Sequence, residues 1–157
     1  RMLVTAGYGV GSRMFQIHKS AETWSVETLD TWPRTHFACE QQTPIFQSGR
    51  LFTIMPNDAG PLNRQLVCMN PDGEHLWSSG KGWRFGLGPF MIAGDRILIL
   101  SDDGALTMAD ATTDGFSPIA TADILDGREA WGPLALVNGR LLCRDSHRMV
   151  CLDLRKN

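Results

Sequence analysis

Residues Pro133–Leu141 read PLALVNGRL: a proline, a short apolar run, a turn at glycine, and then arginine followed by an apolar residue. The same order occurs in Pro89–Ile97 (PFMIAGDRI) and in Pro44–Leu51 (PIFQSGRL). The three prolines are 45 and 44 residues apart. A pattern that returns at a nearly constant distance indicates an internal repeat.

A second pattern supports the same repeat. Four short segments end in histidine, asparagine or aspartate, and their starting positions differ by 52, 40 and 43 residues. They are Met14–His18, Leu66–Asn70, Leu106–Asp110 and Met149–Asp153. Chance would have to reproduce both patterns in the same order, so the sequence predicts four copies of one unit.

The turns within each copy favour short β-strands. Asn138-Gly139 and Asp103-Gly104 are dipeptides that tolerate positive φ in tight turns, and Asn70–Gly73 suits a type I turn closed by glycine. No segment has a sustained period of 3.6 residues with helix caps, so helices are not expected. In the third copy the predicted strands are 89–93, 96–101, 105–109 and 116–120, with a turn leading to Gly115.

Four short antiparallel strands in about 45 residues are typical of one β-propeller blade, which must stack on neighbouring blades to bury both faces. Arg1 aligns with Arg50, so the first copy lacks its first strand, and the last copy ends after its third strand. We therefore expect an all-β, partial β-propeller of about three and a half four-stranded blades. The predicted blade ranges are 1–36, 37–86, 87–130 and 131–157. The remaining blades would come from upstream sequence or from another chain.

Composition excludes two classes of partner. The chain of 157 residues is 43% hydrophobic and 20% charged, which is typical of an ordinary soluble globular segment, and its net charge is only −2. Charged residues that are dispersed along the sequence form no basic patch that would bind nucleic acid. No apolar run approaches the roughly 18 residues of a membrane-spanning helix.

The segment Asn70–Trp77 (NPDGEHLW) resembles the PQQ-like repeat of quinoprotein dehydrogenases and of BamB-type outer-membrane assembly lipoproteins. Trp131–Leu142 and Leu152–Leu154, together with Gly7–Ser12 near the start, are similar to the C-terminal part of bacterial PQQ-like propeller proteins. The resemblance implies a bacterial protein that is periplasmic or secreted. The repeat departs from the family pattern where Ile119 replaces the expected tryptophan.

Two functions are compatible with the resemblance. The first is a non-catalytic module without a cofactor that binds a protein or peptide or acts as a scaffold. The alternative is the C-terminal part of a PQQ-dependent alcohol or sugar dehydrogenase, which would hold PQQ over calcium. The family places a vicinal cysteine pair and acidic calcium ligands in such enzymes, and no two cysteines are adjacent here. The sequence therefore favours the first function, and it assigns no catalytic, cofactor-binding or metal-binding residue.

Binding residues are expected in the connections that lead from one blade to the next, because loops on a rigid scaffold often carry function. Aromatic residues and arginine are enriched at binding hot spots. The candidates are His36, Trp83, Arg84, Arg128, Glu129 and Trp131. The alternative is that these residues only close the joints between blades.

Other conspicuous residues have structural interpretations. Cys68 and Cys151 occupy the same repeat position and are expected to be small apolar residues between blades. A disulfide between Cys143 and Cys151 stays open, since it requires a particular Cβ geometry. Trp24 and Trp77 are expected to pack between neighbouring sheets.

Two further motifs are interpreted as connections. The glycine-rich Gly7–Gly11 segment would need a following helix to bind phosphate, so a turn between strands is the better interpretation. The histidines are interpreted as solvated turn residues, at His18, His36, His75 and His147.

Overall fold

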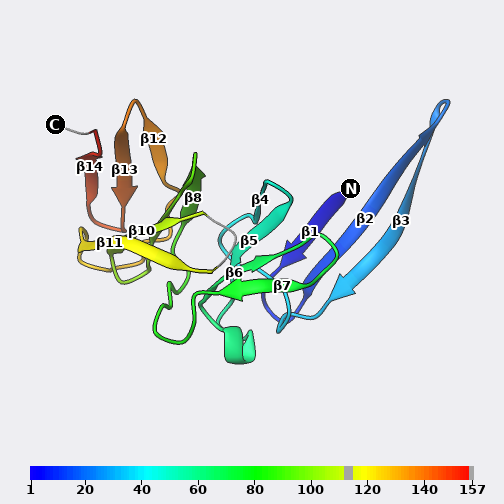
Figure 1. Cartoon of the computed structure of the whole chain (residues 1–157), viewed down its shortest axis with the longest axis horizontal. Coiled ribbons are helices and arrows are strands. Elements are labelled where there is room, and N and C mark those ends of the chain that lie inside the picture. The colour runs from blue at the N-terminus through cyan, green and yellow to red at the C-terminus, as the bar shows by residue number, and fades with distance from the viewer. Residues whose placement is uncertain (112–114, 156–157) are drawn as a thin grey trace.

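The computed structural model describes residues 1–111 and 115–155, and these residues form four antiparallel sheets (Figure 1). We call the sheets blades 1 to 4 in chain order. Blade 1 contains β1 (Met2–Ala6), β2 (Gly11–Ser20) and β3 (Thr23–Trp32). Blade 2 contains β4 (Ile45–Gln47), β5 (Arg50–Ile54), β6 (Leu66–Met69) and β7 (His75–Ser78), with the short 3₁₀ helix η1 (Gly60–Leu62) between β5 and β6.

The other two blades complete the chain. Blade 3 contains β8 (Phe90–Ala93), β9 (Arg96–Leu100), β10 (Ala105–Asp110) and β11 (Ser117–Asp123). Blade 4 contains β12 (Ala135–Val137), β13 (Arg140–Arg144) and β14 (Met149–Asp153). The predicted turn between β10 and β11 includes residues outside the described part. No helix among the described residues is long and apolar enough to cross a membrane.

The four blades follow one another in an open arc, with blade 1 at one end and blade 4 at the other (Figure 1). Within each blade, strands that are consecutive in sequence are hydrogen-bonded neighbours. Two blades have four strands and two have three, so the chain adopts an unclosed β-propeller fold of about three and a half blades, as the repeat predicted.

The hydrophobic core lies between the blades, and this location explains why some strands are apolar at every position. Side chains alternate between the two faces of a strand. In β5, Phe52 and Ile54 pack toward blade 3, whereas Leu51 packs toward blade 1. A strand with a blade on each side is therefore apolar at successive positions, as in β9, where Ile97 to Leu100 are all buried. Burial of such side chains contributes about 1.5–3 kcal/mol each.

The tight turn predicted at Asn138-Gly139 is confirmed. Strand β12 ends at Val137 and β13 begins at Arg140, and the two turn residues have φ of 48° and 74°. Two consecutive positive φ values match a type I′ turn, whose twist suits a two-residue hairpin.

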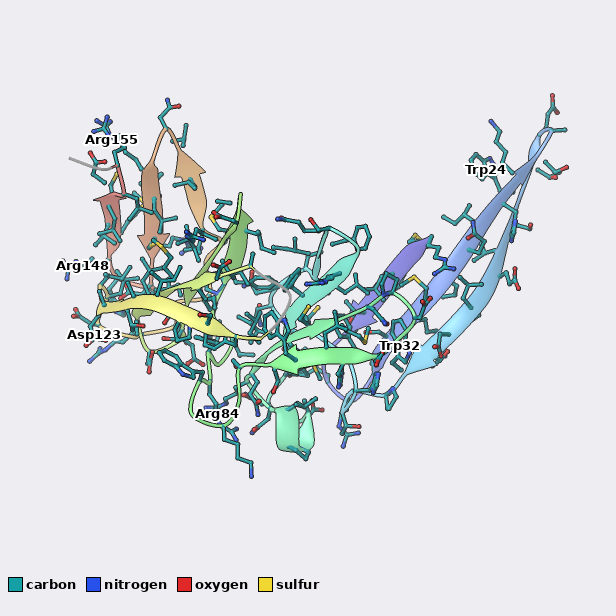
Figure 2. All side chains as sticks on the ribbon, in the orientation of Figure 1. Trp24, Trp32, Arg84, Asp123, Arg148 and Arg155 are labelled. Atoms are coloured by element: carbon teal, nitrogen blue, oxygen red, sulfur yellow. The ribbon has the colours of Figure 1, made fainter. Side chains whose placement is uncertain are left out.

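The hairpin of blade 1 is longer than the sequence predicted. Strands β2 and β3 have ten residues each and project beyond the other blades (Figures 1 and 2). Trp24 lies near the tip and is 66% exposed, with the Lys19 ammonium 5.2 Å from its ring centroid. The prediction that Trp24 packs between sheets is therefore wrong, because no neighbouring blade reaches the tip. Trp77 does pack between sheets, beside the cluster that joins blades 2 and 3, with ring centroids 6.4 Å from Phe116.

The first repeat also requires a correction to its alignment. Met2 lies opposite Phe15 in blade 1, whereas Leu51 lies opposite Met69 in blade 2. If Arg1 is aligned with Arg50, these pairings make Phe15 equivalent to Met69, whereas the alignment of the third strands makes Phe15 equivalent to Val67. The two alignments therefore differ by two residues. A shift of two leaves every side chain on the same face of its strand, so the apolar pattern alone does not reveal it.

The predictions for Cys68 and Cys151 have different outcomes. Cys68 is fully buried between blades 2 and 3, as expected, whereas Cys151 is exposed, because the described residues include no blade on that side of blade 4. Cys143 lies opposite Val150, and Cys151 lies opposite Leu142, so the two thiols are on opposite faces of the sheet. They form no disulfide, and all four cysteines are free.

Candidate functional site

The six candidate residues lie on one side of the arc. A blade's second-to-third strand connection and its exit to the next blade lie on the same side, along the lower side of Figure 1. The turns β4–β5 and β12–β13 lie on the upper side. We call the lower side the rim face, and it consists of residues 7–10, 33–44, 55–65, 79–89, 101–104, 124–134 and 145–148.

His36 is held in the joint between blades 1 and 2. Its ring stacks on that of His75 in β7, with centroids 4.3 Å apart. The Nε2 of His36 lies 2.7 Å from the Gly73 carbonyl oxygen, and the Nε2 of His75 lies 2.7 Å from the His36 carbonyl oxygen. Burial lowers the pKa of His75 below its ordinary value of 6.5, although its hydrogen bond to the His36 carbonyl acts in the opposite direction. The interpretation of His36 and His75 as solvated turn residues is therefore wrong, whereas His18 and His147 are exposed.

Trp83 and Arg84 belong to the connection between β7 and β8 but differ in environment. The Trp83 ring packs against Phe116 with centroids 5.6 Å apart, beside the core between blades 2 and 3. The Ser79 hydroxyl donates a 2.7 Å hydrogen bond to the Trp83 carbonyl oxygen. Arg84 is exposed, and its guanidinium donates a 3.1 Å hydrogen bond to the Asn63 carbonyl oxygen. Of this pair, only Arg84 is exposed, whereas Trp83 is half-buried.

Arg128, Glu129 and Trp131 come together in the connection between β11 and β12. The Arg128 carbonyl oxygen accepts 3.0 Å hydrogen bonds from both the backbone amide and the hydroxyl of Ser146. Glu129 has a φ of 53°, and its carbonyl oxygen accepts a 2.8 Å hydrogen bond from the Trp131 amide. These bonds fix the segment on blade 4 while Trp131 stays 39% exposed.

This segment borders a cleft of about 420 Å³, which we call the rim cleft. It is lined by Asp126, Arg128, Asp145 and His147. The Asp145 carboxylate accepts hydrogen bonds of 2.8 and 2.7 Å from the amides of His147 and Arg148. Those amides hold the pKa of Asp145 below its ordinary value. The rim cleft therefore presents carboxylates, a guanidinium and an imidazole, and it is bordered by the segment that also carries the partly exposed Trp131.

Sequence reasoning missed three of the four residues that line the rim cleft, namely Asp126, Asp145 and His147. Their position in the repeat could have indicated them, because residues 145–148 connect the second and third strands of the last repeat. That connection lies on the same side of a blade as the exit to the next blade.

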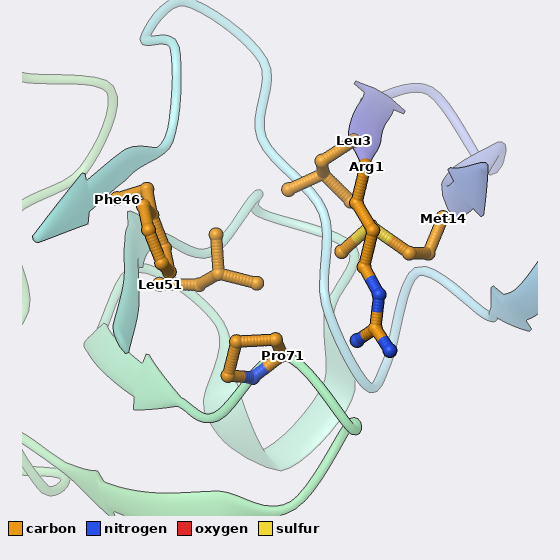
Figure 3. A pocket seen from close by; sticks show the side chains of 6 residues that line it. All are labelled: Arg1, Leu3, Met14, Phe46, Leu51 and Pro71. Atoms are coloured by element: carbon orange, nitrogen blue, oxygen red, sulfur yellow. The ribbon is translucent and has the colours of Figure 1, made fainter. Parts of the chain in front are cut away.

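A second cleft, of about 450 Å³, lies between blades 1 and 2 (Figure 3). Leu3 and Met14 come from blade 1, and Phe46 and Leu51 face them from blade 2. Its lining is almost entirely apolar, with the guanidinium of Arg1 at its edge. None of the six sequence candidates lines this cleft.

The described residues hold no arrangement suited to a metal ion. Within 1–111 and 115–155, no three His, Cys, Asp or Glu side chains gather closely enough to form such a site.

The blade order and rim geometry define the chain as a β-propeller protein, and known structures agree. It matches the computationally designed protein Ika4 with a TM-score of 0.58 and 11% identity, over 96% of this chain and 89% of Ika4. It matches BamB from Moraxella catarrhalis with a TM-score of 0.52 and 15% identity, over 88% of this chain and 45% of BamB. The match to AztD from Citrobacter koseri has a TM-score of 0.54 and 15% identity, over 96% of this chain and 43% of AztD.

These likenesses concern the fold. The sequence matches no known protein family, and no curated protein matches it in sequence. The chain spans less than half the length of BamB and of AztD.

Proposed function

We propose that the chain is a non-catalytic, PQQ-like β-propeller module of an exported bacterial protein, and that it binds a protein or peptide through its rim face. The resemblance of Asn70–Trp77 to the PQQ-like repeat supports the family and the location. The fold is compatible with this function but does not select it, because one fold hosts many functions.

One observation carries the proposal. Hydrogen bonds to Ser146 fix the segment that holds Arg128 and Trp131, and the segment borders the rim cleft. A segment whose backbone is already fixed loses less conformational entropy when a partner covers it, and tryptophan and arginine are residue types that are enriched among the hot spots of interfaces. The guanidinium and the carboxylates of Asp126 and Asp145 give the surface polar groups of both signs for a peptide's own charged groups.

Connections from two different blades meet on the rim face. The Nε2 of Gln42, which precedes blade 2, lies 3.5 Å from the Trp131 carbonyl oxygen, which precedes blade 4. The connections from different blades thus approach one another on the rim face. A bound peptide is expected to contact more than one of these connections.

The test selects ligands for the purified chain from a random-peptide display library. Enriched peptides should bind at least about tenfold more weakly to Trp131→Ala and to Arg128→Ala than to the unchanged chain. Trp24→Ala is the matched control, because this exposed tryptophan lies at the hairpin tip away from the rim face, and it should leave the affinity unchanged. Failure to enrich any peptide, or equal affinity for all variants, would contradict the proposal.

A further inference from the structure

The charged residues of the rim face are unevenly distributed between the blades. The rim connections around blade 2 carry four basic and two acidic residues, whereas those of blades 3 and 4 carry two basic and five acidic residues. The first group consists of residues 33–44, 55–65 and 79–89, and the second of residues 101–104, 124–134 and 145–148. The rim face is therefore positive around blade 2 and negative over blades 3 and 4, although the net charge of the chain is only −2.

The four basic residues around blade 2 come from three different connections and meet at the loop between β5 and β6. All four are exposed. We call them the basic cluster, and they are Arg34, Arg64, Lys81 and Arg84. Arg84 projects from the lower side of the molecule (Figure 2), and its Nε donates a 3.3 Å hydrogen bond to the Lys81 carbonyl oxygen.

Contacts with the β5–β6 loop hold the three arginines. The Arg34 guanidinium lies 3.2 Å from the Asp58 carboxylate. Arg64 donates a hydrogen bond to the side-chain oxygen of Asn57, and Arg84 donates one to a backbone carbonyl of the same loop. In the part of the chain that the structure describes, Asp58 is the one carboxylate that forms an ion pair with the basic cluster. Most of the positive charge of the cluster is therefore not neutralised within the chain.

The loop that holds the cluster is an insertion in blade 2. Eleven residues connect β5 to β6, whereas four residues connect the corresponding strands in each of the other blades. Met55 and Ala59 of the loop are fully buried with Val67, so the insertion has a small core of its own. Arg64 has a φ of 61°, a left-handed conformation that non-glycine residues adopt at a cost and that recurs at binding sites. Insertions within single repeats often lie on the binding face of a repeat protein.

We propose that the basic cluster binds the acidic end of a peptide, and that the basic end of the same peptide lies over blades 3 and 4. This inference rests on the proposed function and adds the charge pattern and the orientation of the ligand. Guanidinium groups form charge-assisted hydrogen bonds with carboxylates, and these are about twice as strong as neutral ones. Charges more than about 8 Å apart are largely screened at physiological ionic strength, so each part of the rim face acts on the part of the peptide nearest to it.

The negative part of the rim face favours a peptide over a uniformly negative ligand. A nucleic acid strand or an anionic membrane that covered the whole rim face would place phosphates beside exposed carboxylates. These carboxylates belong to Asp103, Asp126 and Glu129. Like charges brought together in this way cost several kcal/mol in a complex. A peptide avoids the cost because it carries both signs of charge in the order that the surface requires.

The peptides enriched on the unchanged chain provide the first test. They should carry acidic residues toward one end and basic residues toward the other. Lys81→Glu should weaken their binding by about threefold or more, and Lys81→Glu combined with Arg84→Glu by at least about tenfold. The Lys81 side chain forms no hydrogen bond or ion pair with the described residues, so its substitution changes the charge without breaking such a contact.

Arg140→Glu is the matched control for this charge reversal. Arg140 is exposed at the β12–β13 turn, on the side of the molecule opposite the rim face, and its substitution changes the net charge by the same amount as Lys81→Glu. It should leave the affinity of the enriched peptides unchanged. Equal losses in Arg140→Glu and Lys81→Glu would overturn the basic cluster as the binding surface, because the effect would then come from net charge alone.

An exchange of charges separates binding from a structural effect. A synthetic copy of an enriched peptide, with its acidic residues replaced by lysine, should bind the double variant at least about threefold more tightly than it binds the unchanged chain. Raising sodium chloride from about 0.05 to about 0.5 M should weaken the original peptide more on the unchanged chain than on the double variant. Far-ultraviolet circular dichroism confirms that each variant is folded.

The outcomes distinguish this inference from the proposed function. Peptides that lose affinity in Trp131→Ala but not in the double variant, or that carry no acidic residues, would overturn the role of the basic cluster and leave the proposed function standing. A single-stranded DNA oligonucleotide that binds as tightly as the peptides, and that the double variant also weakens, would overturn the inference in favour of a polyanion. Failure to enrich any peptide would contradict the proposed function and this inference together.

Discussion

The rings of His36 and His75 stack across the joint between blades 1 and 2, with 4.3 Å between centroids and 16° between planes. Each Nε2 faces a carbonyl oxygen at 2.7 Å, and a carbonyl only accepts hydrogen bonds, so each ring carries its proton on Nε2. A further proton on both rings would place two positive charges side by side in a partly buried site. The joint therefore favours a neutral imidazole at His75.

Acid should weaken this joint. Because the pKa of His75 is lowered in the folded chain, the unfolded chain takes up a proton first as the pH falls below about 6.5. Stability is thus fully present above that pH and falls as the pH drops toward the lowered folded pKa. Urea unfolding followed by tryptophan fluorescence should show a lower midpoint at about pH 5.5 than at about pH 7.5. His75→Gln should reduce this difference and His147→Gln should not; equal pH dependence in both variants would contradict the role of His75.

The two tryptophans Trp83 and Trp24 should respond differently to the same substitution. Trp83 packs on Phe116 beside the core, so Trp83→Ala should lower the free energy of unfolding by about 2 kcal/mol. Trp24 projects from the hairpin tip, so Trp24→Ala should change it by less than about 0.5 kcal/mol. Chemical denaturation measures both values, and similar effects in the two variants would contradict the packing described for Trp83.

Gly88 is required for a close backbone approach. A Cβ added there would overlap the carbonyl oxygen of Leu100, which belongs to buried strand β9. Gly88→Ala should therefore lower the free energy of unfolding by about 2 kcal/mol or more, because the strand must shift. Gly82, in the same connection, has open space around it, and Gly82→Ala should be nearly neutral. Thermal unfolding of the two variants provides the comparison, with equal melting temperatures as the contrary result.

The repeat in the sequence was sufficient to predict the strand order and the number of blades, because each strand between two blades must be apolar on both faces. Ile97 to Leu100 and Leu66 to Met69 are such strands. The same rule could not predict how far β2 and β3 extend, because the exposed part of a hairpin leaves no burial pattern. It also does not account for the exposure of Cys151, which has a core position in the repeat, because the described residues include no blade on that side of blade 4.

The candidate site was predicted less completely, for a related reason. Arg128 and Trp131 were found because they lie in a connection between blades. Asp145 and His147 lie in another connection, distant in sequence, and only the position of the Arg128 carbonyl beside Ser146 brings the two segments together. His36 was assigned to the surface because sequence position alone does not show that its ring meets His75.

Two thiols should stay unreactive in the folded chain. Burial raises the pKa of Cys68 and of Cys143 to about 11, so almost no thiolate forms near neutral pH, and reagents have no access. Mass spectrometry after brief treatment with iodoacetamide at about pH 8 should find both residues unmodified, and both modified once urea unfolds the chain. Rapid labelling of either residue under native conditions would show that its joint between blades opens.

The turn at Asp145 should control the shape of the rim cleft. Its carboxylate accepts hydrogen bonds from the amides of His147 and Arg148, and these bonds favour the ionised form. Their contribution to stability is present above the ordinary pKa of 3.8 and is lost as the pH falls through the lowered folded pKa. Asp145→Ala removes the acceptor, so hydrogen exchange of the His147 and Arg148 amides, followed by NMR, should become at least about fivefold faster.

Asp145→Asn is the matched variant, because its side-chain carbonyl still accepts from the same amides although it carries no charge. Exchange at His147 and Arg148 should stay closer to that of the unchanged chain, and the protection of these amides relative to their intrinsic exchange rates should no longer fall as the pH drops, because there is no carboxylate to protonate. Peptides selected on the rim face should bind Asp145→Ala more weakly even though Trp131 and Arg128 are intact, because the turn that positions the Arg128 segment is loosened. Unchanged exchange in Asp145→Ala would show that Ser146 alone holds the segment, through its bonds to the Arg128 carbonyl.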